Sequence, residues 1–410
     1  MALLNIQQPN TLHQPVAQKG HPFWELAFRP WFLLAALWSV FAVAIWMGFL
    51  HGKPLTHQWH MLNPLVWHTH EMIFGFAATV AAGFVLTAVQ TWTSQPSLSG
   101  KPLMLLTFVW IAARICFALN DSTSVYLGFA LQMLWWLGVI ISYSKLVLKV
   151  KNKRNYVFIG IFSVMMFANA SLLIADIQQN IPLAIHIAQT AVLMFVLLIS
   201  LIAGRVIGFF TKNGAPQSNP QQYPWLNLVC NLLSAICALG IFLTYFSRNP
   251  VIWYLLSFIF ISTGILQTIR LIGWQPHKTF KVPLLWSLHA TFLAMSFGLI
   301  LMGISFVTNN IGFSDALHLI TVGSIGGMIL AMIARVSLGH TGRMIIVGNT
   351  MAVAFGALII AGISRSALAI FGMPQLSWKI SAALWIIGFM IFVVVYTPIL
   401  FAARKDRIGC

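Results

Sequence analysis

Charged side chains are scarce in this sequence. Only 7% of its 410 residues are Asp, Glu, Lys or Arg, whereas soluble proteins contain about 25%. At the same time 59% of the residues are hydrophobic, and apolar runs recur at the length that crosses a bilayer. A folded globular protein of this size and composition would not be soluble in water. The composition therefore excludes a soluble protein and predicts an all-α, polytopic membrane protein embedded in a lipid bilayer.

Other absences narrow the class further. Cys116, Cys230, Cys237 and Cys410 show neither metal-site nor disulfide spacing. No Cys-x-x-Cys-His motif is present, which excludes covalent attachment of a c-type haem. The polar N-terminus lacks the hydrophobic core of a signal peptide, so we expect no cleaved signal. The net charge of +17 reflects the basic loops of a membrane protein, and we predict no nucleic-acid partner.

Apolar segments of about 20 residues, separated by Pro, Gly, Asn or charged residues, predict about twelve transmembrane helices. They lie near 31–50, 65–90, 102–120, 124–148, 156–178, 183–210, 225–246, 250–272, 284–307, 313–338, 344–364 and 378–402. The longest connection, TKNGAPQSNPQQYP, follows the sixth segment and is the predicted midpoint linker. We expect one transmembrane domain over residues 31–403, between a polar segment 1–30 and a tail 404–410.

The distribution of Lys and Arg predicts the orientation. If the N-terminus is cytoplasmic, 18 of the 23 Lys and Arg residues fall inside and 5 outside. The five outside are Lys53, Arg114, Arg248, Arg365 and Lys379. Because loops rich in Lys and Arg stay in the cytoplasm, both termini are expected there.

The histidines fall into two layers, and the bilayer centre has none. The outer layer comprises His51, His57 and His60 in the first loop, His68 and His70 opening the second segment, His186 opening the sixth and His318 opening the tenth. The inner layer comprises His21, His277, His289 and His340. A loop histidine can simply bind headgroups or water, but an imidazole inside a span is costly without a task. Imidazole is the commonest metal ligand and an axial haem ligand, so we predict metal ligands at His68, His70, His186 and His318.

Carboxylates accompany two of these histidine positions. On an α-helical wheel His68 and Glu71 share a face with the small residues below them, while His70 points nearly the opposite way. Small residues there permit close approach of a neighbouring helix or of a flat cofactor. Asp315 and His318 are likewise three residues apart, above the glycine-rich GSIGG. A carboxylate beside each imidazole could fix its tautomer, as it does for many metal ligands.

The inner layer offers a second set of candidates. His289 and His340 lie in PLLWSLH and SLGHTGR, and Arg205 and Arg335 each end a span. The two arginines fit the positive-inside rule without further function. Alternatively, the two arginines bind haem propionates or another anion, for which a guanidinium is suited.

Five ordered strings resemble the NnrS family: LAFRPWFLLAALWSV, WHTHEMIFGFAATVAAGFVLTAVQTWT, LIAGRVIGFFT, PLLWSLH and ALHLITVGSIGGMILAMIARVSLGHTGR. The resemblance runs from about residue 20 to the end of the last span. It implies a twelve-span bacterial inner-membrane protein that binds haem and copper and is linked to denitrification and nitric oxide tolerance. One departure is QTWTSQ after the second span, where the family pattern has Asn in place of Gln90.

Three functions then compete. The first is a protein with non-covalent haem b and copper that binds or turns over nitric oxide, which as an oxidoreductase would need an electron donor that the sequence does not identify. The second is a transporter or exporter of a metal or a metal–nitrosyl species, although the halves show no similarity and the midplane has no charged site. The third is a sensor, which lacks a soluble output domain.

Overall fold

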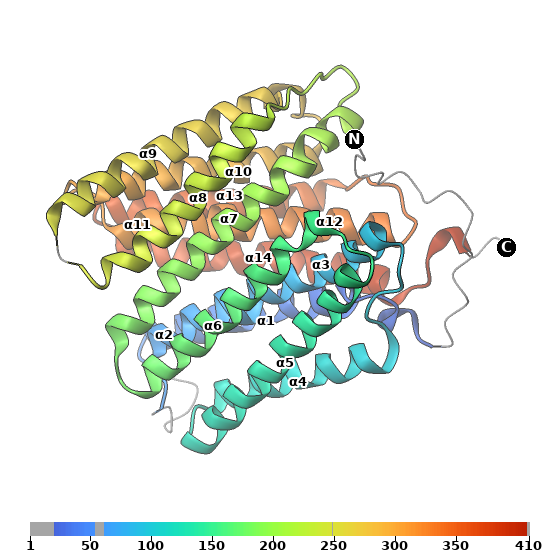
Figure 1. The fold of residues 1–410 in the computed structure, drawn as a ribbon, viewed down its shortest axis with the longest axis horizontal. Coiled ribbons are helices and arrows are strands. Elements are labelled where there is room, and N and C mark those ends of the chain that lie inside the picture. The colour runs from blue at the N-terminus through green and yellow to red at the C-terminus, as the bar shows by residue number, and fades with distance from the viewer. Residues whose placement is uncertain (1–19, 54–60, 248, 408–410) are drawn as a thin grey trace.

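The computed structural model describes residues 20–53, 61–247 and 249–407. Every regular element in these residues is a helix, and twelve helical segments are long and apolar enough to cross a membrane. The predicted all-α, polytopic class is therefore confirmed. The segments run roughly side by side, with α4 and α5 at one edge of the bundle and α8 and α9 at the opposite edge (Figure 1).

The single-element spans are α1 (Phe28–Leu50), α4 (Gly100–Leu119), α5 (Ser122–Lys149), α6 (Val157–Ile177), α7 (Ile181–Gly214), α8 (Pro224–Thr244), α9 (Pro250–Gly273), α10 (Pro283–Ser305), α13 (Asn349–Ile370) and α14 (Pro374–Phe401). The second span joins α2 (Pro64–His70), η2 (Glu71–Ala77) and α3 (Ala78–Thr93). The tenth joins α11 (Phe313–His318), η5 (Leu319–Gly326) and α12 (Gly327–His340). Short 3₁₀ turns are η1 (Pro22–Trp24), η3 (Lys153–Asn155), η4 (Pro276–Lys278) and η6 (Lys405–Arg407).

Asn-Pro pairs start two of the spans. The asparagine at 63–64 caps α2, its side-chain oxygen accepting from the Leu65 amide at 3.0 Å. The pair at 249–250 starts α9 in the same way, with the Val251 amide at 2.9 Å. The proline fits the first turn because its missing N–H would have had no partner there, and asparagine supplies the acceptor that the next amides need.

One predicted span is displaced along the chain. The eleventh segment was expected over 344–364, but α13 begins at Asn349 and ends at Ile370. Arg365 was counted among the outer charges, just beyond the predicted segment. It lies within α13, and its guanidinium is 3.1 Å from Asp315, so the charge is paired.

The spans that carry the outer histidines are the most enclosed. In the second and tenth spans 78% and 72% of the most hydrophobic stretch is buried inside the protein, and in α7 and α10 61%. The spans at the edges are mostly exposed to lipid, with values of 33% for α5 and α8. The predicted site residues therefore belong to the core of the bundle.

The start of the first span and the end of the last span meet at the same end of the bundle. Arg29, at the start of α1, donates from Nη1 to the carbonyls of Leu400 and Ala402 at the end of α14, both at 2.7 Å. We call this end the terminal face and the other end, where α2 and α11 begin (Figure 1), the distal face. Which face is cytoplasmic, and the division into 1–30, 31–403 and 404–410, stay predictions.

Two stretches are π-helical, a feature that the sequence did not predict. They are η2 and η5, and each begins directly after a predicted metal ligand, His70 or His318. π-helical segments inside α-helices are rare and are found mostly at functional sites.

Replacing Arg29 with Gln should destabilise the bundle by about 3 kcal/mol, because two buried carbonyls lose a charged donor. Equilibrium unfolding in mixed detergent micelles measures this. Arg154→Gln, which changes an exposed arginine, is the matched control and should alter the free energy of unfolding little. Equal effects from the two substitutions would contradict the role given to Arg29.

Candidate functional site

A buried chain of polar groups crosses the distal half of the bundle. Nδ1 of His70 lies 2.8 Å from Oε1 of Glu71, and Nη1 of Arg114 lies 2.7 Å from Oε2 of the same carboxylate. Trp38 Nε1 donates to that oxygen at 2.6 Å, and Arg114 also donates to Gln132. His70, Glu71 and Gln132 are fully buried. A charged carboxylate survives in this setting because charged and neutral donors surround it.

Gly75 makes room for this chain. A Cβ at this position would lie 2.6 Å from both Arg114 Nη1 and Glu71 Oε2. The small face of the second span therefore accommodates a guanidinium from α4, where the sequence suggested a neighbouring helix or a flat cofactor.

His70 presents one free nitrogen. Because Nδ1 faces a carboxylate, it carries the proton and donates, which leaves the lone pair on Nε2. Nε2 is buried and has no hydrogen-bond partner in the described part of the chain. The ring packs edge-on against Phe117, with centroids 4.8 Å apart. A buried nitrogen without a partner costs about 1–3 kcal/mol unless a ligand satisfies it.

The expected pairing of His68 with Glu71 is wrong, since Glu71 bonds to His70 instead. His68 stacks on Trp46, with centroids 4.7 Å apart and planes 11° from parallel, and its Nδ1 is buried without a partner in the described residues. The wheel failed because it assumed an α-helix, whereas Glu71 begins a π-helical segment.

The expected pairing of Asp315 with His318 is also wrong. Asp315 forms its ion pair with Arg365 of α13. His318 Nδ1 donates to the Ser314 carbonyl at 2.6 Å, which leaves Nε2 as the nitrogen with a lone pair. His68 and Arg365 are close enough to His318 to act on it electrostatically. Two half-buried imidazoles from different spans thus lie in one neighbourhood at the distal face.

His186 does not join these histidines. Its Nε2 donates to the carbonyl of Ile241 in α8 at 2.7 Å, and its ring lies 5.3 Å from Tyr245. Across residues 20–53, 61–247 and 249–407, no three His, Cys, Asp or Glu side chains gather closely enough to hold a metal ion. The loop histidines at 57 and 60 lie outside the described residues. The four-histidine ligand set stays a prediction.

The inner candidates lie toward the terminal face. His289 Nδ1 donates to the Leu285 carbonyl at 2.9 Å, and its Nε2 lies 3.3 Å from the Thr211 hydroxyl of α7. The His340 ring lies 5.7 Å from the Phe28 ring. His289 and His340 therefore contact different helices, α7 and α1.

The two predicted anion clamps also differ in their contacts. Arg335 lies over the Phe210 ring at 3.7 Å, a close cation–π contact. Arg205 donates to Asn155 at 3.1 Å and lies over Phe158. Neither forms an ion pair with a carboxylate of the described residues, so both keep a net positive charge inside the protein.

The family model described as NnrS protein matches residues 22–404. This chain belongs to the NnrS family. The match begins at η1 and passes the end of α14, so it spans all twelve helical segments. The resemblance seen in the sequence is thereby confirmed. A comparison with curated proteins finds no match.

Four contact residues of this NnrS chain were not predicted as part of the site. They are Trp38, Arg114, Gln132 and Arg365. For Arg114 a signal was present, because it lies within the predicted span 102–120, where a charge needs a partner. Its assignment as an outer loop charge concealed that signal. Trp38 and Gln132 are ordinary residues of apolar spans, and only the fold brings them to Glu71.

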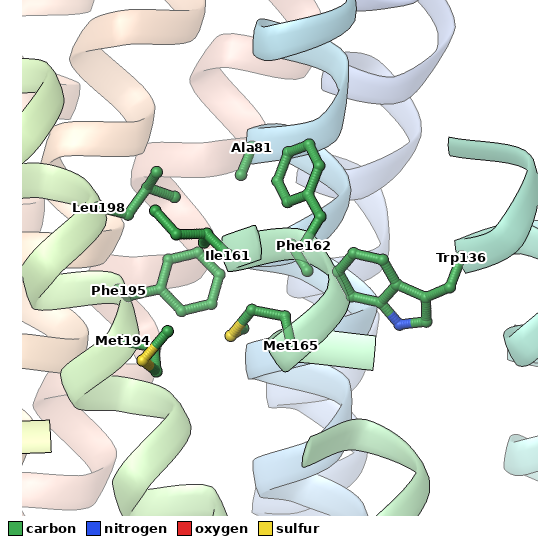
Figure 2. A pocket seen from close by; sticks show the side chains of 9 residues that line it. Ala81, Trp136, Ile161, Phe162, Met165, Met194, Phe195 and Leu198 are labelled. Carbon is green, nitrogen blue, oxygen red and sulfur yellow. The ribbon is translucent and has the colours of Figure 1, made fainter. Parts of the chain in front are cut away.

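An apolar cavity adjoins the second span of this NnrS protein deeper in the bundle (Figure 2). It is lined by Ala78, Ala81, Trp136, Ile161, Phe162, Met165, Met194, Phe195 and Leu198, from α3, α5, α6 and α7. The Trp136 Nε1 is engaged by Asn169 at 3.0 Å, so the lining offers no strong hydrogen bond. The cavity has room for about one water-sized molecule, and its chemistry favours an apolar occupant.

Gly75→Ala should lower stability by about 1–3 kcal/mol, because the new methyl group meets Arg114 and Glu71. The matched control is Gly356→Ala in α13, where a Cβ would meet nothing within 4 Å. That change should stabilise the helix by up to about 1 kcal/mol. Unfolding in mixed micelles gives both values. Effects of the same sign at the two glycines would show that Gly75 has no such role.

Proposed function

We propose that this NnrS family member binds non-covalent haem b and copper in a bacterial inner membrane, and contributes to nitric oxide defence by binding or turning over nitric oxide at a histidine-ligated metal. The observation that carries the proposal is the buried Nε2 of His70, which has no described partner and is aligned by Glu71.

A typical metal-binding histidine donates a hydrogen bond to a carboxylate from the ring nitrogen that does not bind the metal. The carboxylate fixes the tautomer and raises the basicity of the other nitrogen. In this chain Arg114 and Trp38 hold Glu71 in turn, so the imidazole of His70 is aimed by a chain of fully buried groups. An imidazole held in this way supplies one of the ligands that an iron or copper ion would need. When bound, haem iron with an open position supplies a site for nitric oxide, and copper supplies a second one-electron centre.

His68 and His318 support a second ligand pair. Nδ1 of His68 is buried without a hydrogen-bond partner in the described residues. His318 donates through Nδ1, which leaves the lone pair of its Nε2 for a ligand. The nearby Arg365 is neutralised by Asp315, which reduces its repulsion of a bound cation. His186 would have to give up the Ile241 carbonyl to join them.

The terminal face has basic side chains that suit the propionate carboxylates of a haem. Arg335 and Arg205 carry positive charges without a described carboxylate partner, which suits haem propionates. His340 and His289 are the imidazoles at this end. His289 already uses both ring nitrogens, so His340 is the better ligand candidate of the two.

The apolar cavity suits the substrate. Nitric oxide is small and uncharged, so hydrocarbon does not exclude it. Ala78 and Ala81 place the cavity on the span that carries His70, which gives a dissolved gas a resting place within the bundle.

The first test is an absorption spectrum of the detergent-purified protein, oxidised, reduced with dithionite and then exposed to nitric oxide, with copper assayed in the same sample. We expect a Soret band that shifts on addition of nitric oxide, together with bound copper. A colourless, copper-free protein from haem-replete and copper-replete cells would contradict the proposal.

Single substitutions test the ligands. His70→Ala and His68→Ala should lose bound metal or haem while still inserting into the membrane. Glu71→Gln keeps the shape of the side chain but weakens the hydrogen bond to His70, and should lower metal affinity by about 10–100-fold. His51→Ala changes an exposed histidine and is the matched control. Full haem and copper content in the His70 and His68 variants would reject these residues as ligands.

A further inference from the structure

Arg270 is another buried charge, and it lies near the terminal face, away from the histidines of the distal face. It belongs to α9, about one turn from the terminal face, and is only 4% exposed. Its Nη1 donates to the Ser200 hydroxyl at 3.0 Å and to Oε1 of the Gln267 side-chain amide at 3.3 Å. Its Nε is buried without a partner in the described residues. In the sequence Arg270 falls within the predicted span 250–272, and it was counted only among the cytoplasmic charges.

The chain offers Arg270 no counter-charge. It has six Asp and Glu residues, all within the described ranges, and each is engaged elsewhere. Glu25 pairs with Arg29, Glu71 with Arg114, Asp315 with Arg365 and Asp406 with Arg404, while Asp121 accepts from Ser124 and Asp176 from the Asn63 amide. An ion buried without a partner costs several kcal/mol, so an external anion would stabilise this guanidinium.

Polar groups from three helices converge beside the guanidinium. Gln267 Nε2 donates to the Ser200 hydroxyl at 2.9 Å and to the Ser234 hydroxyl at 3.2 Å. Ser200 in turn donates to Asn231 at 2.7 Å. The Ser200 oxygen therefore receives both a guanidinium N–H and an amide N–H. These hydrogen bonds already engage Nη1 and the Gln267 amide. Nε is the guanidinium donor that is buried without a partner in the described residues, and a charged donor of this kind favours a negatively charged acceptor.

The backbone of α7 is shaped to admit the guanidinium. A Cβ at Gly204 would lie 1.7 Å from Arg270 Nη2, so only glycine lets the side chain rest there. On its other side the guanidinium lies 5.2 Å from the Trp274 ring centroid. The charged group is held in place by packing that is independent of its hydrogen bonds.

We propose that Arg270, Ser200 and Gln267 form a binding site for a small monovalent inorganic anion between α7, α8 and α9. The anion neutralises the guanidinium and accepts a hydrogen bond from its Nε, while Ser200 and Gln267 hold the guanidinium in place. The burial of Arg270 limits the ligand to ions of about the size of chloride or nitrate. This site shares no residue with the histidine groups.

The test is the thermal stability of the detergent-purified protein in chloride, nitrate or gluconate at constant ionic strength. Chloride or nitrate should raise the unfolding temperature of the wild type by a few degrees and saturate, because a ligand that binds only the folded state stabilises it. Gluconate has the same charge but is too large for the site. An equal response to all three anions would overturn the proposal.

Single substitutions test whether the anion-dependent stabilisation arises at Arg270. Arg270→Gln should abolish the saturable response, and Arg154→Gln, an exposed arginine on η3, should retain it. If Arg270→Gln does not fold, Gly204→Ala decides, because it displaces the guanidinium without removing the charge. Gly204→Ala should raise the half-saturating anion concentration at least tenfold. Its control is Gly160→Ala, where a Cβ would meet nothing within 4 Å. A wild-type response from Arg270→Gln or Gly204→Ala would refute the site.

Discussion

Charge neutralisation inside hydrocarbon is the constraint on which this structure depends. A charged group in a bilayer must find a partner or remain at the interface, and this chain has 23 basic side chains but only six acidic ones. Glu71 is fully buried and contacts both the Arg114 guanidinium and the neutral imidazole of His70. Its position fixes how α4 packs on the second span, requires a glycine at 75, and orients the imidazole. The distal half of the bundle is organised around this single carboxylate.

The same constraint explains how much the sequence could predict. Twelve spans follow from apolar length and from Pro, Gly and Asn at their ends, and all twelve are present. The residue types of the site could be predicted because imidazoles and carboxylates are conspicuous in apolar segments. Their partners could not. Asp315 was expected to serve His318 three residues away, but an arginine from α13 binds it, and a contact between distant segments leaves no local pattern.

The basic residues in the core divide into two kinds. Arg114 and Arg365 are paired with carboxylates near the distal face, and the carboxylate that Arg114 holds also contacts the candidate ligand His70. Arg205, Arg270 and Arg335 lie toward the terminal face and contact hydroxyls, amides and aromatic rings. The carboxylates at that face, Glu25 and Asp406, pair with Arg29 and Arg404 instead. In the described residues the other three guanidinium charges are therefore not balanced by a carboxylate, which suits anionic ligands.

The π-helical segments have a consequence for how the two halves of a span relate to each other. Each π segment is equivalent to one residue added to an α-helix, so it shifts the helical phase of everything that follows it. Deleting one residue within 72–77 would let the second span return to an α-helix. That would turn α3 by about 100° relative to His70. Ala78 and Ala81 would then no longer face the cavity. The extra residue thus determines which side chains of α3 line the cavity for a given position of His70.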